Sequence, residues 1–172
     1  MANTPAYLAK SQFVGQLHLD FGNYVHFNEF AYDVEQDYLL KLLGYEIKSL
    51  LEASPSTEKY ANILNGCEWT DTNGVLKKQR GFKEMVKYFF YYRFRIEEED
   101  PRTKSGDPTE AYIKAVSGAK HILNKRIIRN YNRGVIIFNE IIEYMTYIEG
   151  QTSDTYENWS YETLEESNSF GI

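Results

Sequence analysis

The sequence predicts a mainly α-helical protein: a helical bundle of four to five helices with an extended N-terminal arm, a small hairpin near 67–78 and a projecting loop near 101–108. Apolar residues recur at the three- and four-residue spacing of a helix face through much of residues 29–149. Glycine, proline and asparagine cluster between these segments, where turns are expected. The 172 residues, 42% hydrophobic and 26% charged, suit one globular core.

Residues 1–28 lack helical periodicity. Apolar and polar residues alternate loosely from Phe13 to Phe27, and Gly15 and Gly22 interrupt the pattern. This segment is predicted as an extended arm, with some tendency to form strands, that packs on its own domain or on a neighbour. Whether the arm orders only on assembly stays open at this point.

A first long helix is predicted over residues 29–53, and a short second helix ends at Gly66. Pro55 lies just beyond the long helix, and glycine suits the C-terminus of the short one. The Asn73-Gly74 dipeptide is a strong hairpin signal because both residues tolerate positive φ. The apolar face of the long helix consists of Leu39, Leu42, Leu43, Ile47, Leu50 and Leu51.

The next long helix, from Gly81 to about Glu98, carries aromatic residues almost all round. Such a helix lies at the centre of a bundle or between subunits, so Tyr91 and Tyr92 are predicted inter-subunit contacts. Fifteen Tyr and ten Phe exceed what a helical core needs, and tyrosine suits surfaces that become buried on assembly. A base-stacking platform is the less favoured interpretation, because these side chains would splay to all sides.

The C-terminal half is predicted as two helices, about 109–131 and 135–149, with Gly134 as either a kink or an end. A polar tail follows from Gln151, and whether it orders only on a partner is open. The chain is therefore divided into an arm (1–28), a helical domain (29–150) and an acidic tail (151–172).

The net charge of −6 is distributed unevenly along the chain. The tail has five acids and no Lys or Arg, whereas residues 111–134 have six basic residues and no acid. The two segments could pair within a subunit or between subunits. Four of the basic residues are candidate contacts: Lys125, Arg126, Arg129 and Arg133.

The same basic residues support an alternative function. Lys125, Arg129 and Arg133 recur every four residues, so they form a stripe that could follow the phosphates of a nucleic acid. The chain would then be a small helical nucleic-acid-binding protein that uses helix 111–134. A solvated helix face, or a partner for the acidic tail, is the favoured interpretation, because the overall charge is negative.

The sequence lacks the usual catalytic signatures. It contains no glycine-rich phosphate loop, no HExxH and no GxSxG motif. The acidic run at 97–100 is consecutive rather than alternating, as a calcium loop would be. Cys67 stands next to an acid, which disfavours a reactive thiolate. His18, His26 and His121 are far apart in the sequence. We therefore expect no enzyme, no metal and no cofactor.

No apolar run approaches the roughly 18 residues that span a bilayer, and the N-terminus lacks a basic region followed by an apolar stretch. We therefore expect no contact with a membrane.

Three segments resemble the head–tail connector (adaptor) proteins of tailed phages, most closely those of crAss-like phages and other phages of Bacteroides-type hosts. They are YLLKLLGYE at 38–46, YANILNGCE at 60–68 and KQRGFKEMVKYFFYY at 78–92, followed by a polar loop and more helix. The likeness covers about residues 29–125. The chain departs from the family pattern in its longer charged helical region after the loop and in its acidic tail, so the exact ring in the connector stack is not defined.

The resemblance implies a structural ring of about twelve copies that docks on the portal, contacts adjacent connector or tail proteins, and lets DNA pass without sequence-specific contact. It implies a place in the virion after assembly in the host bacterial cytoplasm. The loop would project toward a neighbouring subunit or ring, and Trp159 in the tail is a further candidate contact. The loop contacts are Arg102, Thr103, Lys104, Ser105 and Asp107.

Overall fold

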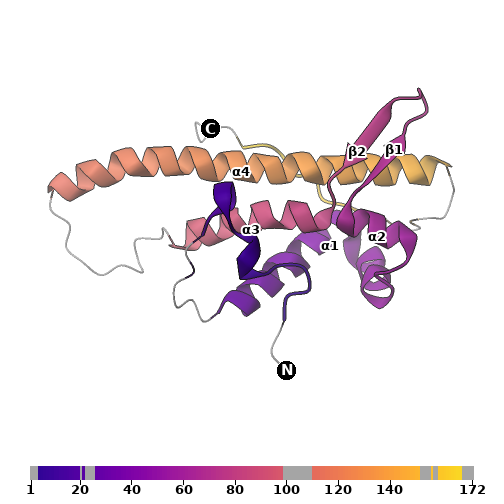
Figure 1. Ribbon diagram of the computed structural model, residues 1–172, viewed down its shortest axis with the longest axis horizontal. Helices are drawn as coiled ribbons and strands as arrows, with labels where there is room; N and C mark the ends of the chain where they lie inside the picture. Colours follow the sequence, from indigo (N-terminus) through magenta and orange to yellow (C-terminus); the bar gives the residue numbers. More distant parts are fainter. Residues whose placement is uncertain are drawn as a thin grey trace.

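A computed structural model describes residues 4–19, 21, 26–98, 110–151, 156 and 159–167, without the side chains of 97–98 and 110–124. The protein is mainly α-helical, with four α-helices and a two-stranded hairpin in this part of the chain, as the sequence predicted. Two long helices, α3 (Phe82–Glu98) and α4 (Glu110–Gln151), lie side by side along the molecule, and α1 and α2 cover α3 on the other side (Figure 1). The projecting loop predicted near 101–108 lies outside the described residues.

The predicted first helix is confirmed as α1 (Phe27–Ala53), but it is not straight. Gly44 has φ +67° and ψ 173°, which lies outside the helical region and breaks α1 into two segments. Leu39, Leu42 and Leu43 before the break, and Ile47 after it, are all buried. The predicted core face is confirmed for these residues and for Leu51, but Leu50 is 48% exposed, so its assignment to that face was wrong. The spacing also gave no sign of the kink.

The short helix and the hairpin also match the predicted positions. Helix α2 spans Glu58–Asn65, and β1 (Cys67–Thr70) pairs antiparallel with β2 (Leu76–Gln79). The loop that connects the strands is longer than a two-residue Asn-Gly turn, and the Asp71 side chain stabilises it. Its carboxylate accepts the backbone N–H groups of Asn73 and Val75, each at 2.9 Å.

Aromatic side chains of α3 form the centre of the core. Phe82, Phe89, Phe90 and Tyr91 are fully buried, and α3 contacts α1, α2 and α4. The Phe89 ring stacks on Tyr38 of α1 at a centroid distance of 3.9 Å. The sequence allowed this helix to lie at the centre of a bundle or between subunits, and in the structure it lies at the centre of the bundle.

Helix α4 is one continuous helix of 42 residues, so the predicted division into two helices was wrong. Gly134 neither ends nor kinks it. A Cβ atom at Gly134 would lie 2.9 Å from the Phe89 ring, which is closer than such atoms approach. The glycine is therefore explained by the close packing of α4 on α3.

The N-terminal arm packs on its own domain. It forms two short 3-10 turns, η1 (Lys10–Gln12) and η2 (Gly15–Leu17), and no strand in its described part. Phe13 is buried, and its ring lies 4.6 Å from that of Phe90. The predicted packing on the chain's own domain is confirmed, whereas the predicted strand tendency is not seen.

A buried carboxylate fixes the start of the arm to α1. The Glu35 oxygens accept the backbone N–H groups of Ala6, Tyr7 and Leu8 at 2.7, 2.8 and 2.6 Å. Burial raises the pKa of Glu35, although the three backbone hydrogen bonds act in the opposite direction. The side chain satisfies three backbone donors, of which that of Leu8 is buried and would otherwise lack an acceptor.

Replacing Gly134 by alanine is expected to destabilise the protein by about 1–3 kcal/mol, because the added methyl group meets the buried Phe89 ring. Gly150→Ala is the matched control in the same helix. Nothing lies within 4 Å of a Cβ at that position, so this change should gain up to about 1 kcal/mol of helix propensity. Urea unfolding followed by circular dichroism measures both. Equal stabilities for the two variants would contradict the close packing.

Glu35→Ala is expected to cost about 1–3 kcal/mol, because it leaves three backbone N–H groups without their acceptor. Hydrogen exchange at the amides of residues 6–8 should accelerate more than exchange in α3. The control is Glu29→Ala, at an exposed carboxylate that contacts His26, and it should change stability by less than about 0.5 kcal/mol. Unchanged exchange at residues 6–8 would show that the arm does not depend on this carboxylate.

Candidate interaction surface

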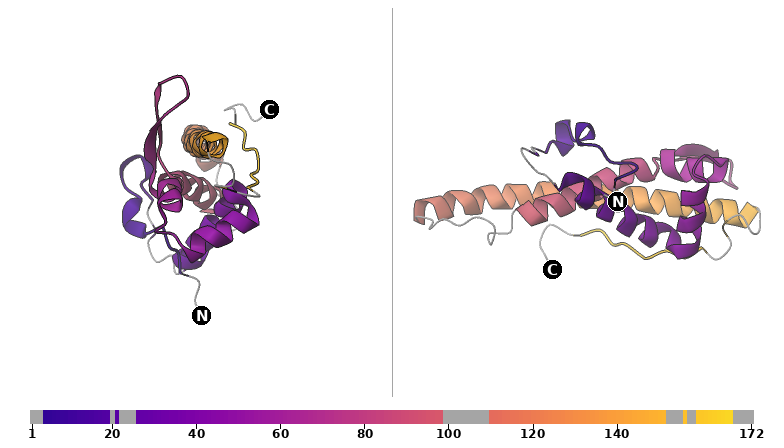
Figure 2. Two further views of the ribbon diagram at one scale, coloured as in Figure 1. Left: turned by 90° about the vertical axis from the view of Figure 1, so that its right-hand side faces the viewer. Right: turned by 90° about the horizontal axis from the view of Figure 1, so that it is seen from below.

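The C-terminal tail runs back over the helical domain as a strap, which we define as Tyr156 and residues 159–167 (Figure 2). Trp159 donates its indole N–H to the Leu42 carbonyl at 2.9 Å, and the Glu162 backbone N–H donates to the Lys41 carbonyl at 2.8 Å. A helix break leaves carbonyls of the preceding turn without intrahelical partners. The strap therefore supplies the donors that the kink at Gly44 requires.

The strap is attached to two other helices as well. Tyr156 is 1% exposed, its backbone N–H donates to Glu149 Oε2 of α4 at 2.9 Å, and its hydroxyl donates to the Lys59 carbonyl of α2. Asn132 of α4 and the Ser167 backbone exchange two hydrogen bonds at 2.8 and 2.9 Å. The described part of the tail is therefore ordered on its own chain, and Trp159 is one of its anchors.

The four candidate cations of α4 form a second surface, which we call the basic ridge: Lys125, Arg126, Arg129 and Arg133. Lys125, Arg126 and Arg129 are exposed, and Arg133 is half-buried. Arg126 donates to the Gln16 carbonyl at 2.6 Å, and Arg133 donates to the side-chain oxygen of Gln16. The arm thus forms one wall of a hollow whose other lining residues belong to α4.

The strap reaches α4 beside the basic ridge without neutralising it. Its contact there, between Asn132 and Ser167, is uncharged. Among the residues that the structure describes, no carboxylate lies within ion-pair distance of any ridge residue. The pairing of basic helix and acidic tail that the sequence suggested is therefore not seen as ion pairs within the described part of one chain.

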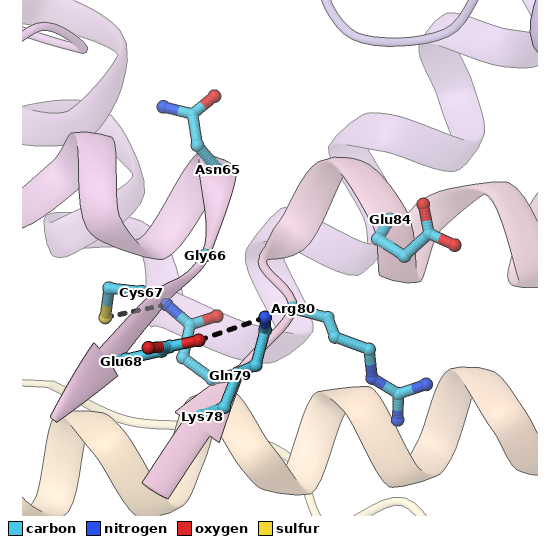
Figure 3. A pocket seen from close by; sticks show the side chains of 8 residues that line it. All are labelled: Asn65, Gly66, Cys67, Glu68, Lys78, Gln79, Arg80 and Glu84. Carbon is cyan, nitrogen blue, oxygen red and sulfur yellow. Dashed lines mark hydrogen bonds and ion pairs between the residues drawn. The ribbon is translucent and has the colours of Figure 1, made fainter. Parts of the chain in front are cut away.

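A second hollow lies at the base of the hairpin, and its charges are already paired (Figure 3). Lys78 contacts Glu68 across the strands at 3.2 Å, and Arg80 points toward α4, where both oxygens of Glu140 accept its N–H groups. Figure 3 also shows Glu84 pointing away from the Glu68–Lys78 pair. These side chains fasten the hairpin rather than converge on a ligand.

The remaining predicted contacts lie elsewhere. Tyr91 is 0% exposed, so its prediction as a surface contact was wrong: the ring is part of the core. Tyr92 is half-buried, with its ring 4.7 Å from that of Tyr131. The predicted loop contacts lie outside the described residues: Arg102, Thr103, Lys104, Ser105 and Asp107.

Sequence reasoning missed the apolar tip of the hairpin. Val75 and Leu76 are 52% and 68% exposed, and Figure 1 shows the hairpin projecting past α4. The signal was present as two adjacent apolar residues directly after an Asn-Gly turn, where solvated side chains are usual. Sequence reasoning also missed the role of Gly44 as the place where the strap crosses α1.

Comparisons with models of known protein families, with curated proteins and with solved structures found no match. Within the described ranges, no group of three His, Cys, Asp or Glu side chains could hold a metal ion. No helix in the same part of the chain is long and apolar enough to cross a bilayer.

Trp159→Phe is expected to destabilise the protein by about 1 kcal/mol, because the Leu42 carbonyl loses its donor. It should also increase protease cleavage within residues 159–167. Tyr161→Phe is the matched control, since that ring is 48% exposed, and it should leave both stability and cleavage nearly unchanged. If both variants behave like the unmodified protein, the strap is not held by the indole.

Proposed function

We propose that this chain is a structural subunit of a phage head–tail connector ring, which docks on the portal and links the capsid to the tail around the DNA channel. The observation that carries the proposal is the resemblance of the segments at 38–46, 60–68 and 78–92 to connector proteins. In this role the protein performs no catalysis. Its partners are copies of itself, the portal and adjacent connector or tail proteins.

The fold supports the proposal because the three segments pack together. They lie in α1, in α2 with β1, and in β2 with α3, and α3 contacts both α1 and α2. The three segments that carry the resemblance therefore belong to one packed unit of the chain.

The shape of the subunit also suits assembly. A ring subunit must present two different faces that complement each other. The exposed apolar hairpin tip and the basic ridge lie at different places along α4 (Figure 1), since the hairpin pairs with Glu140 and Glu143 and the ridge occupies residues 125–133. Separate apolar and charged surfaces of this kind are what a heterologous contact uses.

The test is the native mass of the purified protein, alone and mixed with the portal protein of the same genome, by native mass spectrometry. A closed oligomer is expected, and about twelve copies of the 20.2 kDa chain would weigh about 240 kDa. Co-assembly with the portal alone would also agree with the proposal. A monomer that does not bind the portal would contradict it.

The basic ridge favours one other function, a small nucleic-acid-binding protein. Its cations occupy successive turns of α4 and could contact phosphates. Changing Arg126, Arg129 and Arg133 to alanine should then weaken binding to duplex DNA and reduce its salt dependence. No detectable affinity for duplex DNA at moderate salt would dismiss this function.

A further inference from the structure

We infer that the basic ridge of one copy binds the acidic strap of the neighbouring copy, so that each subunit supplies the ridge to one neighbour and the strap to the other. The inference rests on the proposed ring. It names the side chains that make the contact between copies, which neither the fold nor the resemblance specifies.

The ridge is shaped to receive an extended anionic segment. Lys125 and Arg129 are separated by four residues, so they lie about 6 Å apart along the axis of α4. Both are exposed, whereas the neighbouring Ile127 and Asn130 are buried and fix the orientation of this face. Arg126 and Arg133 are held on one flank by Gln16 and keep further N–H donors for a carboxylate.

The strap presents its acids outward. Its hydrogen bonds to the helical domain use the Trp159 indole, the Tyr156 backbone and hydroxyl, and the backbone of Glu162 and Ser167. The carboxylates of Glu162, Glu165 and Glu166 belong to exposed residues, and none makes an ion pair with another described residue. An extended segment fixed by its backbone thus leaves a row of negative charges for another molecule.

One chain does not bring the two surfaces together as ion pairs. The strap is tied at Leu42, at Lys41 and at Asn132 through uncharged contacts, and Tyr156 is tied to the Glu149 carboxylate, so none of these contacts uses a ridge cation. A second copy can supply the carboxylates that the ridge lacks within one chain. Repeated head to tail, such a contact generates a closed ring when its rotation divides a full turn.

A second copy fits the ridge better than nucleic acid does. The chain carries a net charge of −6, so a polyanion approaches it against an overall repulsion. Another copy has the same net charge, but its strap supplies carboxylates at fixed positions, and Arg pairs with carboxylates through two parallel hydrogen bonds. Each copy also provides one ridge and one strap, so every ridge in the ring has a strap to bind.

The experiment uses two full-length charge-reversal variants and sedimentation at low salt. The ridge variant is Lys125→Glu with Arg129→Glu, and the strap variant is Glu165→Lys with Glu166→Lys. Each variant alone places like charges at the contact, so its self-association should weaken at least about tenfold relative to the unmodified protein. A one-to-one mixture should restore association, because each charged row again meets its opposite.

Further arms separate the alternatives. Lys83→Glu is a control reversal of an exposed cation of α3, away from the ridge and from the hairpin strands, and it should leave association unchanged. A chain carrying both the ridge and the strap reversals should assemble. Restoration in that chain without restoration in the mixture would place the pairing within one chain and overturn the inference.

The remaining outcomes also decide the matter. If both variants form the same ring as the unmodified protein, the inference fails while the proposed connector function stands. If the unmodified protein is a monomer at low salt, the inference fails, and if it also ignores the portal, the proposed function fails with it. If ridge reversal abolishes binding to duplex DNA but leaves self-association intact, the ridge is a phosphate-binding surface instead.

Discussion

The packing of α4 on α3 at Gly134 determines where the other elements can lie. With no side chain at that position, the two helices approach closely enough for the Phe89 ring to fill the contact. The same ring stacks on Tyr38 of α1 and meets Tyr131 of α4 edge-on. One aromatic side chain of α3 thus contacts both α1 and α4. A shift of α4 would displace α1 as well, because densely packed interiors transmit strain.

Both ends of the chain are attached to this core through backbone hydrogen bonds. Glu35 receives three backbone N–H groups of the arm, and the strap donates to carbonyls next to the kink at Gly44. In each case a non-helical segment supplies backbone or side-chain N–H donors, and a group on α1 that would otherwise lack a partner accepts them. A continuous α1 would offer the strap no free carbonyls. The position of the strap therefore depends on the kink in α1.

The sequence predicted the elements whose signal is local and missed those that depend on distant partners. Leucine spacing located α1, and Asn73-Gly74 located the hairpin. Gly134 could be interpreted only as a break from the sequence. A glycine that makes room for a ring on another helix cannot be told from one that ends a helix until the position of Phe89 is known. The ridge was visible as a four-residue repeat, but its contact with Gln16 joins residues more than a hundred positions apart.

Some charged side chains of α4 form ion pairs within the chain, and others do not. Toward its C-terminus, Glu140 and Glu143 are paired with Arg80, which follows β2, and with Lys77 of β2, so these two carboxylates are neutralised within the chain. Toward the N-terminal side, Arg126 and Arg133 of the ridge donate to neutral oxygens of Gln16, and Arg126 also lies over the Tyr91 ring. Folding alone gives no reason to gather cations on one stretch and carboxylates on a strap beside it, since dispersed charges would solvate as well. Complementary rows left unpaired by the subunit are a feature that association between copies would use.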